Sequence, residues 1–191
     1  MRVGVFALQG DVREHILMLK ALGAEALEVR NKADLDQVDG LILPGGESTT
    51  ISKLLDIFEM RQHLKDFISS GKPVYGTCAG MILLANDVLD AASGQKSLGA
   101  IDVSVRRNAF GSQLDSFETE LLFDEIPARV AFIRAPIVER VGPGVEVLSK
   151  LQDGTVVAIR KGNILATSFH PEITGDKTVH KYFLSMVSAQ A

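Results

Sequence analysis

The feature that most constrains the fold of this chain is an alternation, in its first half, of short apolar runs with stretches of helical periodicity. Apolar runs rich in β-branched residues occupy residues 2–8, 26–30, 40–43 and 73–76, and apolar side chains recur at helical spacing over residues 12–22. Strands that are apolar on both faces are typical of a parallel sheet covered by helices. Strand alternating with helix therefore predicts right-handed crossovers and a doubly wound sheet.

Further helical segments are expected between and after these strands. Ser48 or Thr49 can cap a helix whose apolar residues extend to Phe58, and a second helical stretch runs to Gly71. The apolar residues 81–88 predict another helix directly after the fourth apolar run. These helices would cover the faces of the sheet.

The second half of the chain is richer in β pattern. Apolar and polar residues alternate from residue 101 to 105, as they do in a strand with one solvated face. Short strands between glycine and proline turns are expected at residues 117–123, 128–134, 145–151, 155–160 and 163–169. A closing helix is expected at residues 177–188. The predicted fold class is α/β: a flavodoxin-like, doubly wound and mostly parallel sheet with helices on both faces and antiparallel edge strands in the second half.

Composition and charge exclude several classes of protein. With 46% apolar and 23% charged residues among 191, the chain is expected to form one globular domain over residues 1–191. Its net charge is −4 and no run of five like charges occurs, which argues against nucleic acid as a partner. No apolar stretch approaches the roughly 20 residues that span a bilayer, and the start has no signal-peptide pattern. We therefore expect a cytoplasmic protein without a membrane contact.

The single cysteine occupies a turn that suits a nucleophile. Cys78 lies in the sequence Gly-Thr-Cys-Ala-Gly at residues 76–80, between a predicted strand and a predicted helix. This is the layout of a nucleophile elbow, in which glycines permit the tight turn and the helix N-terminus favours a thiolate. The alternative is a buried, inert cysteine, the common state of an isolated free thiol. The position at the carboxyl end of a strand favours the nucleophile.

A thiol nucleophile requires a base, and the chain offers four histidines. His15, His63 and His180 lie on predicted helices, where a solvated surface position is the expectation for each. His170 instead follows a predicted strand, and the proline after it favours extended geometry. In an extended segment Glu172 would project to the same side as His170 and could orient its imidazole, as the acid does in a Ser-His-Asp triad. The alternative for this segment is a simple turn.

Acyl transfer also needs donors for a developing oxyanion. Gly45 and Gly46 follow another strand end, where backbone N–H groups without side chains can approach a substrate closely. The amide of Ala79, directly after the cysteine, is the second natural donor. The alternative for the two glycines is a flexible turn. Glu47 and Ser48 could hold the polar end of a substrate or simply start the next helix.

The chain lacks the sequence patterns of cofactor and metal sites. The first strand-to-helix turn has no G-x-G-x-x-G, so no dinucleotide site is expected there. No Walker loop is present, and four scattered histidines with one cysteine give no zinc-ligand spacing. We therefore expect neither a cofactor nor a metal ion.

Three segments together resemble the class I, or triad, glutamine amidotransferases. They are Pro-Gly-Gly-Glu-Ser at residues 44–48, Gly-Thr-Cys-Ala-Gly at residues 76–80 and Phe-His-Pro-Glu at residues 169–172. Additional segments are similar to the glutaminase subunits of pyridoxal 5′-phosphate synthases; they are residues 8–15, 107–111, 115–118 and 132–136. This resemblance extends from residue 1 to about residue 187.

The resemblance implies a catalytic triad and a set of substrate contacts. Cys78 would attack the side-chain amide of L-glutamine, His170 would move the proton and Glu172 would orient His170, which gives hydrolysis to L-glutamate and ammonia through a glutamyl thioester. The residues implied to contact glutamine are Gly46, Glu47, Ser48, Arg107, Ile133 and Arg134. Arg134 is also expected to need an anionic partner, because it lies in an apolar strand pattern. Arg106 and Arg107 cannot be told apart on physical grounds.

The resemblance also implies a partner. Family members supply ammonia to a separate synthase subunit, a (β/α)₈ barrel that assembles pyridoxal phosphate, and this chain is too short to contain such a barrel. We expect a hetero-oligomer in which docking of the partner completes the oxyanion hole near Gly46. One alternative is a glutaminase subunit that serves another ammonia acceptor. Another is a non-catalytic binding module on the same fold, which the fold class by itself does not exclude.

Overall fold

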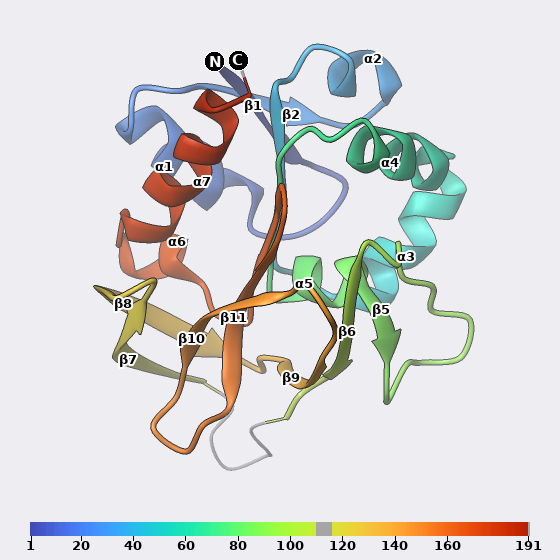
Figure 1. The fold of residues 1–191 in the computed structure, drawn as a ribbon. Helices are drawn as coiled ribbons and strands as arrows, with labels where there is room; N and C mark the ends of the chain where they lie inside the picture. Colours follow the sequence, from blue (N-terminus) through green and yellow to red (C-terminus); the bar gives the residue numbers. More distant parts are fainter. Residues whose placement is uncertain (110–115, 191) are drawn as a thin grey trace.

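The computed structural model describes residues 1–109 and 116–190 of the chain. Its helices are α1 (Val12–Ala21), α2 (Lys32–Leu35), α3 (Ser48–Ile57), α4 (Met60–Ser69), α5 (Ala79–Leu84), α6 (Pro171–Thr174) and α7 (Thr178–Ser188). Its strands are β1 (Arg2–Phe6), β2 (Glu25–Val29), β3 (Gly40–Leu43), β4 (Val74–Thr77), β5 (Ala85–Val88), β6 (Ile101–Arg106), β7 (Ser116–Phe123), β8 (Ile126–Ile133), β9 (Ile137–Val141), β10 (Glu146–Lys150), β11 (Val156–Lys161) and β12 (Ile164–Thr167). Figure 1 shows how they are arranged.

The architecture is α/β, built on one large, mixed sheet. Nine of its ten strands follow the order β2-β1-β3-β4-β12-β11-β9-β6-β5, and β10 pairs with β11 beside this path. The first five of these strands are parallel to one another, and their order is that of a flavodoxin-like doubly wound sheet. Strands β3 and β4 are buried along their whole length, as continuous apolar runs in a parallel sheet should be.

Helices cover both faces of the parallel part of the sheet. Figure 1 shows α1, α6 and α7 on one side and α3, α4 and α5 on the other. Each side encloses its own apolar core. Leu19, Phe183 and Val187 belong to the first core, and Ile51, Leu55 and Leu64 to the second. The predicted doubly wound arrangement is thus confirmed.

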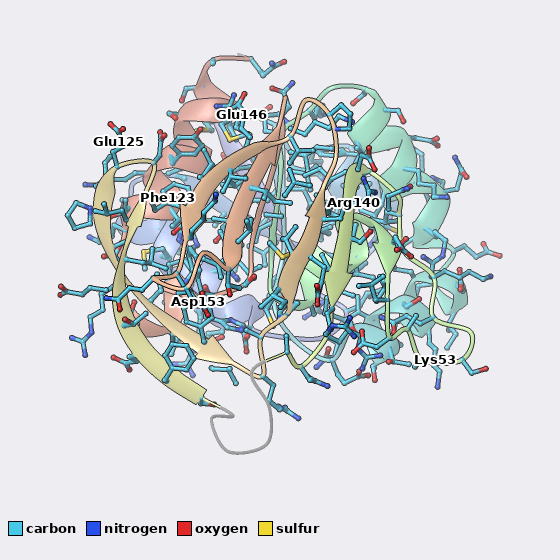
Figure 2. All side chains as sticks on the ribbon, turned by 60° about the horizontal axis from the view of Figure 1, so that its bottom comes forward. Lys53, Phe123, Glu125, Arg140, Glu146 and Asp153 are labelled. Atoms are coloured by element: carbon cyan, nitrogen blue, oxygen red, sulfur yellow. The ribbon has the colours of Figure 1, made fainter. Side chains whose placement is uncertain are left out.

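The second half of the chain differs in part from the predicted edge strands. β12 does not lie at an edge, because it inserts beside β4 and runs parallel to it. The strands β11, β9 and β6 then continue the sheet through antiparallel pairs. β7 and β8 form a separate two-stranded sheet, which carries Phe123 near its turn (Figure 2). The ring of Phe123 packs edge-on against Tyr182 of α7.

Several element boundaries also differ from those predicted. The helix expected over residues 81–88 is α5, which starts at Ala79 and ends at Leu84, and the remaining residues form β5 beside β6. The short polar side chains Asn86 and Asp87 disfavour a continued helix, and a short apolar run alone does not separate helix from strand. The strand β9 and the four-residue helix α2 were not predicted.

The capping residue of α3 is Glu47 rather than Ser48 or Thr49. Its carboxylate accepts hydrogen bonds from the backbone N–H groups of Thr49, at 3.0 Å, and Thr50, at 2.6 Å. A glutamate can cap in this way because its two oxygens reach two of the free amides of the first turn.

Among the described residues, no helix is long and apolar enough to cross a membrane.

Candidate active site

The segments singled out in the sequence meet at one edge of the sheet. β1, β3, β4 and β12 are neighbours in the parallel part, so their carboxyl ends lie together. The segments that follow them carry Gln9 and Asp11, the two glycines Gly45 and Gly46, then Cys78, and finally His170. This is where ligands bind in open α/β sheets.

Cys78 occupies a strained turn between β4 and α5. Its φ of 48° and ψ of −101° are unusual for a residue with a side chain, and its backbone N–H donates to the Thr167 carbonyl at 2.8 Å. Glycine is required on both sides of the turn. A Cβ at Gly76 would come within 2.6 Å of the Gly80 carbonyl carbon, and one at Gly80 would come within 2.1 Å of the Leu43 carbonyl oxygen. The predicted nucleophile-elbow geometry is therefore present.

His170 is held between two strands and a short helix. Its backbone N–H donates to the Ala131 carbonyl at 2.7 Å, and its carbonyl accepts from the Ala131 N–H at 3.3 Å. Its Nδ1 lies 2.7 Å from Oε1 of Glu172 and 3.4 Å from Oδ2 of Asp11. The expected extended conformation holds for His170 itself but not for Glu172, which lies in the first turn of α6. The two side chains meet because His170 precedes the helix directly.

Burial and mutual contacts shift the pKa values of the ionisable side chains around His170. Burial alone would lower the pKa of His170, but its hydrogen bonds to Cys78 and Glu172, and the charges of these groups, raise that pKa to about 10. Burial opposes the charge of Glu172, yet contacts with His15 and His170 hold its pKa well below the usual range. Asp11 shows the reverse, since burial raises its pKa. An imidazolium and a buried carboxylate therefore coexist next to the thiol.

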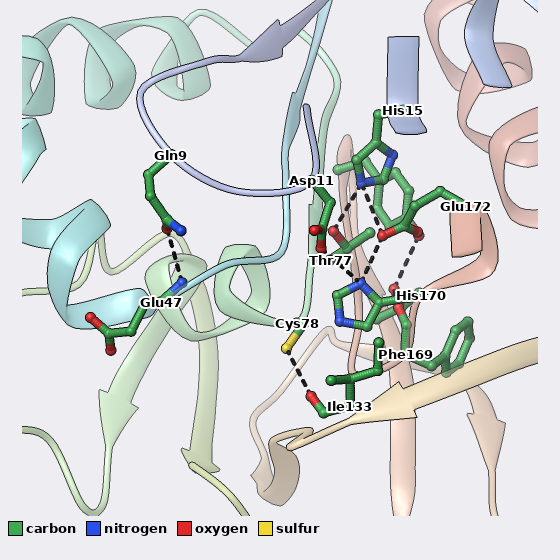
Figure 3. A network of polar contacts seen from close by, with 12 residues as sticks. Gln9, Asp11, His15, Glu47, Thr77, Cys78, Ile133, Phe169, His170 and Glu172 are labelled. Carbon is green, nitrogen blue, oxygen red and sulfur yellow. Dashed lines mark hydrogen bonds and ion pairs between the residues drawn. The ribbon is translucent and has the colours of Figure 1, made fainter. Parts of the chain in front are cut away.

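A cavity of about 300 Å³ opens onto the thiol and the imidazole. Its lining residues are Gln9, Asp11, Gly46, Glu47, Ser48, Cys78, Ile82, Arg107, Asn108, Ile133, Arg134 and His170. The Sγ atom of Cys78 lies 3.9 Å from the Ile133 carbonyl oxygen (Figure 3). The thiol is thus accessible from the same space as His170, and the cavity is bordered by both acidic and basic side chains.

The glycine turn after β3 packs closely against this histidine. A Cβ on Gly45 would come within 2.3 Å of Cε1 of His170, so only glycine fits there. Gly46 lies against the Gln9 side chain, whose Oε1 accepts from the backbone N–H of Glu47 at 2.9 Å (Figure 3). The second predicted oxyanion donor, Ala79, is the first residue of α5 and follows Cys78 directly. The two predicted donors therefore lie on segments that border the thiol.

The side chain of Glu47 lies beside Arg107. Its Oε1 is 3.8 Å from the guanidinium of Arg107, and half of the side chain is exposed. Burial is slight, and the hydrogen bonds from Thr50 and Thr49 outweigh it and lower the pKa of Glu47 to about 2. Glu47 therefore presents a permanent negative charge at the rim of the cavity while it caps α3.

The structure separates the two adjacent arginines. Arg106 is the last residue of β6 and pairs outside the cavity with Glu139, at 2.6 Å. Arg107 lines the cavity, and its Nη1 donates to Oε1 of Gln95 at 2.8 Å. Gln95 in turn donates to the Ser48 hydroxyl at 3.0 Å, so a residue that was not predicted joins two predicted ones.

Arg134 does not lie inside an apolar strand as expected. It follows the end of β8, is exposed, and has a φ of 43°. Its guanidinium is not buried, so the argument that it needs an anionic partner to offset burial is wrong. It still lines the cavity, next to Ile133.

Two histidines expected on the surface are completely buried. His15 and His180 have no exposed area, while His63 is only half-buried. The helical spacing carried a signal for both: His15 precedes Leu19 by four residues, and His180 precedes Leu184 by four, so each lies on the apolar face of its helix. Gln9 and Asp11 were also missed as site residues, although they follow the end of β1 at the same edge of the sheet.

Asp11, His170 and Glu172 each place one possible ligand atom within 4.8 Å of the others. Such a spacing could hold a cation, but Nδ1 of His170 is already bonded to Glu172 at 2.7 Å. An imidazolium would also repel a metal ion, and the raised pKa of His170 favours that form. The cluster is therefore better described as a charged histidine between two carboxyl groups than as a metal site.

Comparisons with known proteins show the family to which the chain belongs. The model of the SNO glutamine amidotransferase family matches residues 5–189. A relative from Dehalococcoides mccartyi (strain CBDB1), named pyridoxal 5′-phosphate synthase subunit PdxT, is 56% identical over 97% of both chains. One from Kineococcus radiotolerans with the same name is 57% identical, over 97% of this chain and 94% of the relative.

A solved structure of a similar protein has the same fold. A crystal structure described as a glutamine amidotransferase superposes with a TM-score of 0.92, at 46% identity, and covers 97% of this chain and 98% of the other. Parts of the segments that carried the resemblance, namely Phe110, Gly111 and Asp115, lie outside the described residues. The remaining parts are all placed in the fold described above.

Proposed function

The chain belongs to the SNO glutamine amidotransferase family, and from this premise we propose that Cys78, His170 and Glu172 hydrolyse the side-chain amide of L-glutamine. The observation that carries the proposal is the buried His170–Glu172 pair, 2.7 Å apart, on the same cavity as a thiol in a strained turn. The fold alone would not distinguish an enzyme from a binding module, whereas this constellation has the parts of a nucleophilic hydrolase.

The reaction proceeds in two halves. The thiolate of Cys78 attacks the amide carbon, and the backbone amides of Gly46 and Ala79 stabilise the oxyanion that forms. His170 gives its proton to the amide nitrogen, the C–N bond breaks and ammonia leaves, so that a glutamyl thioester remains. His170 then takes a proton from water, which attacks the thioester and releases glutamate and the thiol. Glu172 stabilises the imidazolium whenever His170 carries the second proton, and it fixes the orientation of the ring in both halves.

The rim of the cavity suits the amino-acid end of the substrate. The guanidinium of Arg107 can bind the α-carboxylate, with Arg134 nearby, and the ionised Glu47 can bind the α-ammonium group. The Ile133 carbonyl and the Ser48 hydroxyl supply further polar contacts. In this pose the side-chain amide of glutamine extends toward Cys78.

Covalent trapping tests the triad. Intact-mass analysis after treatment with a glutamine-mimicking electrophile, with the synthase subunit present, should show one adduct on the wild-type protein and none on Cys78→Ala. His170→Asn should slow adduct formation by at least about 100-fold, because the general base is lost. His63→Asn, a half-buried histidine outside the site, is the matched control and should behave as wild type. An adduct on Cys78→Ala, or none on the wild type, would contradict the proposal.

The ammonia acceptor follows from the relatives. They are named as subunits of pyridoxal 5′-phosphate synthase, so we propose that this chain docks onto a separate synthase subunit and supplies it with ammonia in the cytoplasm. A (β/α)₈ barrel as that subunit is part of the proposal. A glutaminase subunit for another acceptor is the alternative. Affinity capture from cell extract, followed by identification of the bound protein, separates the two.

Docking is proposed to complete the oxyanion hole. The Glu47 amide next to Gly46 is bonded to Gln9, so a change in this turn would be needed to free further donors. The glutaminase rate should therefore rise when the synthase subunit is added. Equal rates with and without that subunit would contradict activation by docking, but they would not contradict the proposed glutaminase activity.

A further inference from the structure

A buried group of polar side chains from four elements lies behind the triad. It consists of His15 on α1, Thr77 at the end of β4, Glu172 on α6 and His180 on α7. His15, Thr77 and His180 have no exposed surface, and neither has the side chain of Glu172. Neither histidine lines the cavity. These groups must therefore satisfy one another, because water does not reach them.

The neighbours of His15 determine where its hydrogen lies. Its Nε2 is 3.2 Å from Oγ1 of Thr77 and 3.4 Å from Oε1 of Glu172 (Figure 3). The pKa of Glu172 is lowered well below its usual range, so its carboxylate is ionised and accepts hydrogen bonds only. A bare Nε2 would direct a lone pair at this negative charge. Nε2 therefore carries a hydrogen, whether the ring bears one proton or two.

His180 supports the ring of His15 from the other side. Its Nε2 lies 2.9 Å from Nδ1 of His15. Burial lowers the pKa of His180 to about 3, so this ring is neutral at physiological pH. With a neutral His15, the hydrogen bond then runs from Nε2–H of His180 to Nδ1 of His15, and Nε2–H of His15 faces both Thr77 and Glu172. The Nδ1 of His180 and the Oε2 of Glu172 have no partner among the described residues.

The Glu172 carboxylate consequently depends on one oxygen. Oε1 faces His170 at 2.7 Å and His15 at 3.4 Å, whereas Oε2 accepts no hydrogen bond from the part of the chain that the structure describes. A carboxylate bonded only through His170 could rotate with that ring. A second imidazole on the opposite side limits the rotation. The orientation of the base therefore depends on a residue that does not line the cavity.

We propose that His15 is a positioning residue of the glutaminase reaction: its Nε2–H fixes the Glu172 carboxylate in the orientation that holds His170, and His180 fixes the ring of His15. The inference rests on the proposed function and deepens it. His15 touches neither the cavity nor the thiol, so it acts on the step that needs a well-aligned base and leaves substrate binding unchanged. The titratable groups that face His15 are Asp11, Tyr75, Glu172 and His180.

Two amide substitutions separate positioning from packing. In His15→Gln the amide nitrogen falls near the position of Nε2, so the contact with Glu172 is retained. In His15→Asn the amide falls near the position of Nδ1, so the contact with His180 is retained and that with Glu172 is lost. With the synthase subunit present, His15→Asn should lower kcat by about 10- to 100-fold with KM unchanged, the size typical of outer partners that orient a functional group. His15→Gln should stay within about threefold of wild type.

His180 provides the second pair of variants. His180→Gln retains a donor toward His15 and should lower kcat less than His180→Leu, which removes it. Equal kcat losses in His15→Gln and His15→Asn, or a loss expressed in KM, would overturn the inference. A kcat in His15→Asn equal to that of the wild type would also overturn the inference.

The wild-type protein offers a test that does not depend on the folding of a variant. In ¹⁵N spectra of labelled histidine, Nε2 of His15 should be protonated, and a bare Nε2 would overturn the inference. Cys78→Ala serves as the reference for the proposed function. If the wild type has no more glutaminase activity than Cys78→Ala, the proposed function fails; if the wild type is active and His15→Asn matches it, only the positioning role fails.

Discussion

Single atoms decide whether the turn at Cys78 can form. The hydrogen in place of a side chain at Gly80 lets α5 approach the end of β3, where the Leu43 carbonyl oxygen would be only 2.1 Å from a Cβ. Gly45 has the same role beside the His170 ring. These glycines are required by close approach and not by a left-handed backbone. The strain at Cys78 is thus maintained by neighbours that leave it no room to relax.

Gly80→Ala adds only one methyl group, but it should strongly lower both the stability of the fold and the reactivity of Cys78. The added methyl must displace the β3 backbone, so we expect a loss of more than about 3 kcal/mol in the free energy of unfolding, together with loss of adduct formation at Cys78. Urea unfolding and the trapping assay measure the two effects. Gly94→Ala is the control: nothing lies within 4 Å of its Cβ, and its positive φ alone should cost about 1 kcal/mol. Similar losses in the two variants would contradict this explanation.

The sequence predicted the residues whose signal is local. Cys78 stands between two glycines, and His170 and Glu172 flank a proline, so each can be recognised from a few neighbours. His15 and His180 could not be assigned in this way, because their contacts join residues 165 positions apart. Their helical spacing indicated burial, but only the fold shows that both rings lie behind Glu172.

At the end of β6, two adjacent arginine side chains point to different sides of the strand. Successive side chains of a strand point to opposite faces, so Arg106 and Arg107 diverge. Arg106 pairs with the exposed Glu139, while Arg107 reaches the cavity and Gln95. The backbone N–H of Arg107 donates to Asp90 at 2.9 Å, which fixes the strand end. The sequence alone could not separate these two arginines, because the exit of the strand sets their directions.

Arg107→Ala and Arg106→Ala form a matched pair for substrate binding. Loss of a charge-assisted hydrogen bond to the substrate costs about 1.5–3 kcal/mol, so Arg107→Ala should raise KM for glutamine by about 10- to 100-fold. Arg106→Ala removes only an exposed ion pair and should change KM by less than about twofold. Glutaminase kinetics with the synthase subunit present measure both. A comparable rise in KM for the two variants would place the substrate elsewhere.

Elements with an uninterrupted pattern between clear boundaries were predicted best. β3 matches its predicted range of residues 40–43, and α7 differs from its range by one residue. β5 was mistaken for helix because it follows α5 without a turn residue, although its polar Asn86 and Asp87 disfavour a continued helix. β9 was missed because two exposed charged residues, Glu139 and Arg140, interrupt its short apolar pattern. Pairing with β6 and β11, which the sequence does not reveal, stabilises it.

At the scale of the whole molecule, the sheet brings distant segments to one site and the helices bury the groups behind it. α1 and α7 pack on the same face, with the two ends of the chain close together (Figure 1), and each contributes one histidine to the core. A neutral histidine enclosed in this way links the stability of the entire fold to pH. The groups that face His180 are His15, Glu172, Asp176 and Tyr75.

The stability of the protein should consequently decline in mild acid. Burial lowers the pKa of His180 to about 3, against about 6.5 in the unfolded chain. Above pH 6.5 the ring is neutral in both states and its contribution is fully present. As the pH falls below 6.5, the unfolded state gains a proton that the folded state does not bind, so unfolding becomes easier. For one such group the loss between pH 7 and pH 5 is about 2 kcal/mol.

Comparison with His180→Gln isolates this contribution, because glutamine does not titrate and keeps a donor toward His15. Urea unfolding at pH 7 and pH 5 should show that wild type loses about 2 kcal/mol more than His180→Gln over this interval, whatever the other groups contribute to both. His63→Gln, at a half-buried position, should lose as much as wild type. If wild type and His180→Gln lose the same amount, His180 does not stay neutral in the folded protein, and the donation of a hydrogen bond from His180 to His15 is wrong.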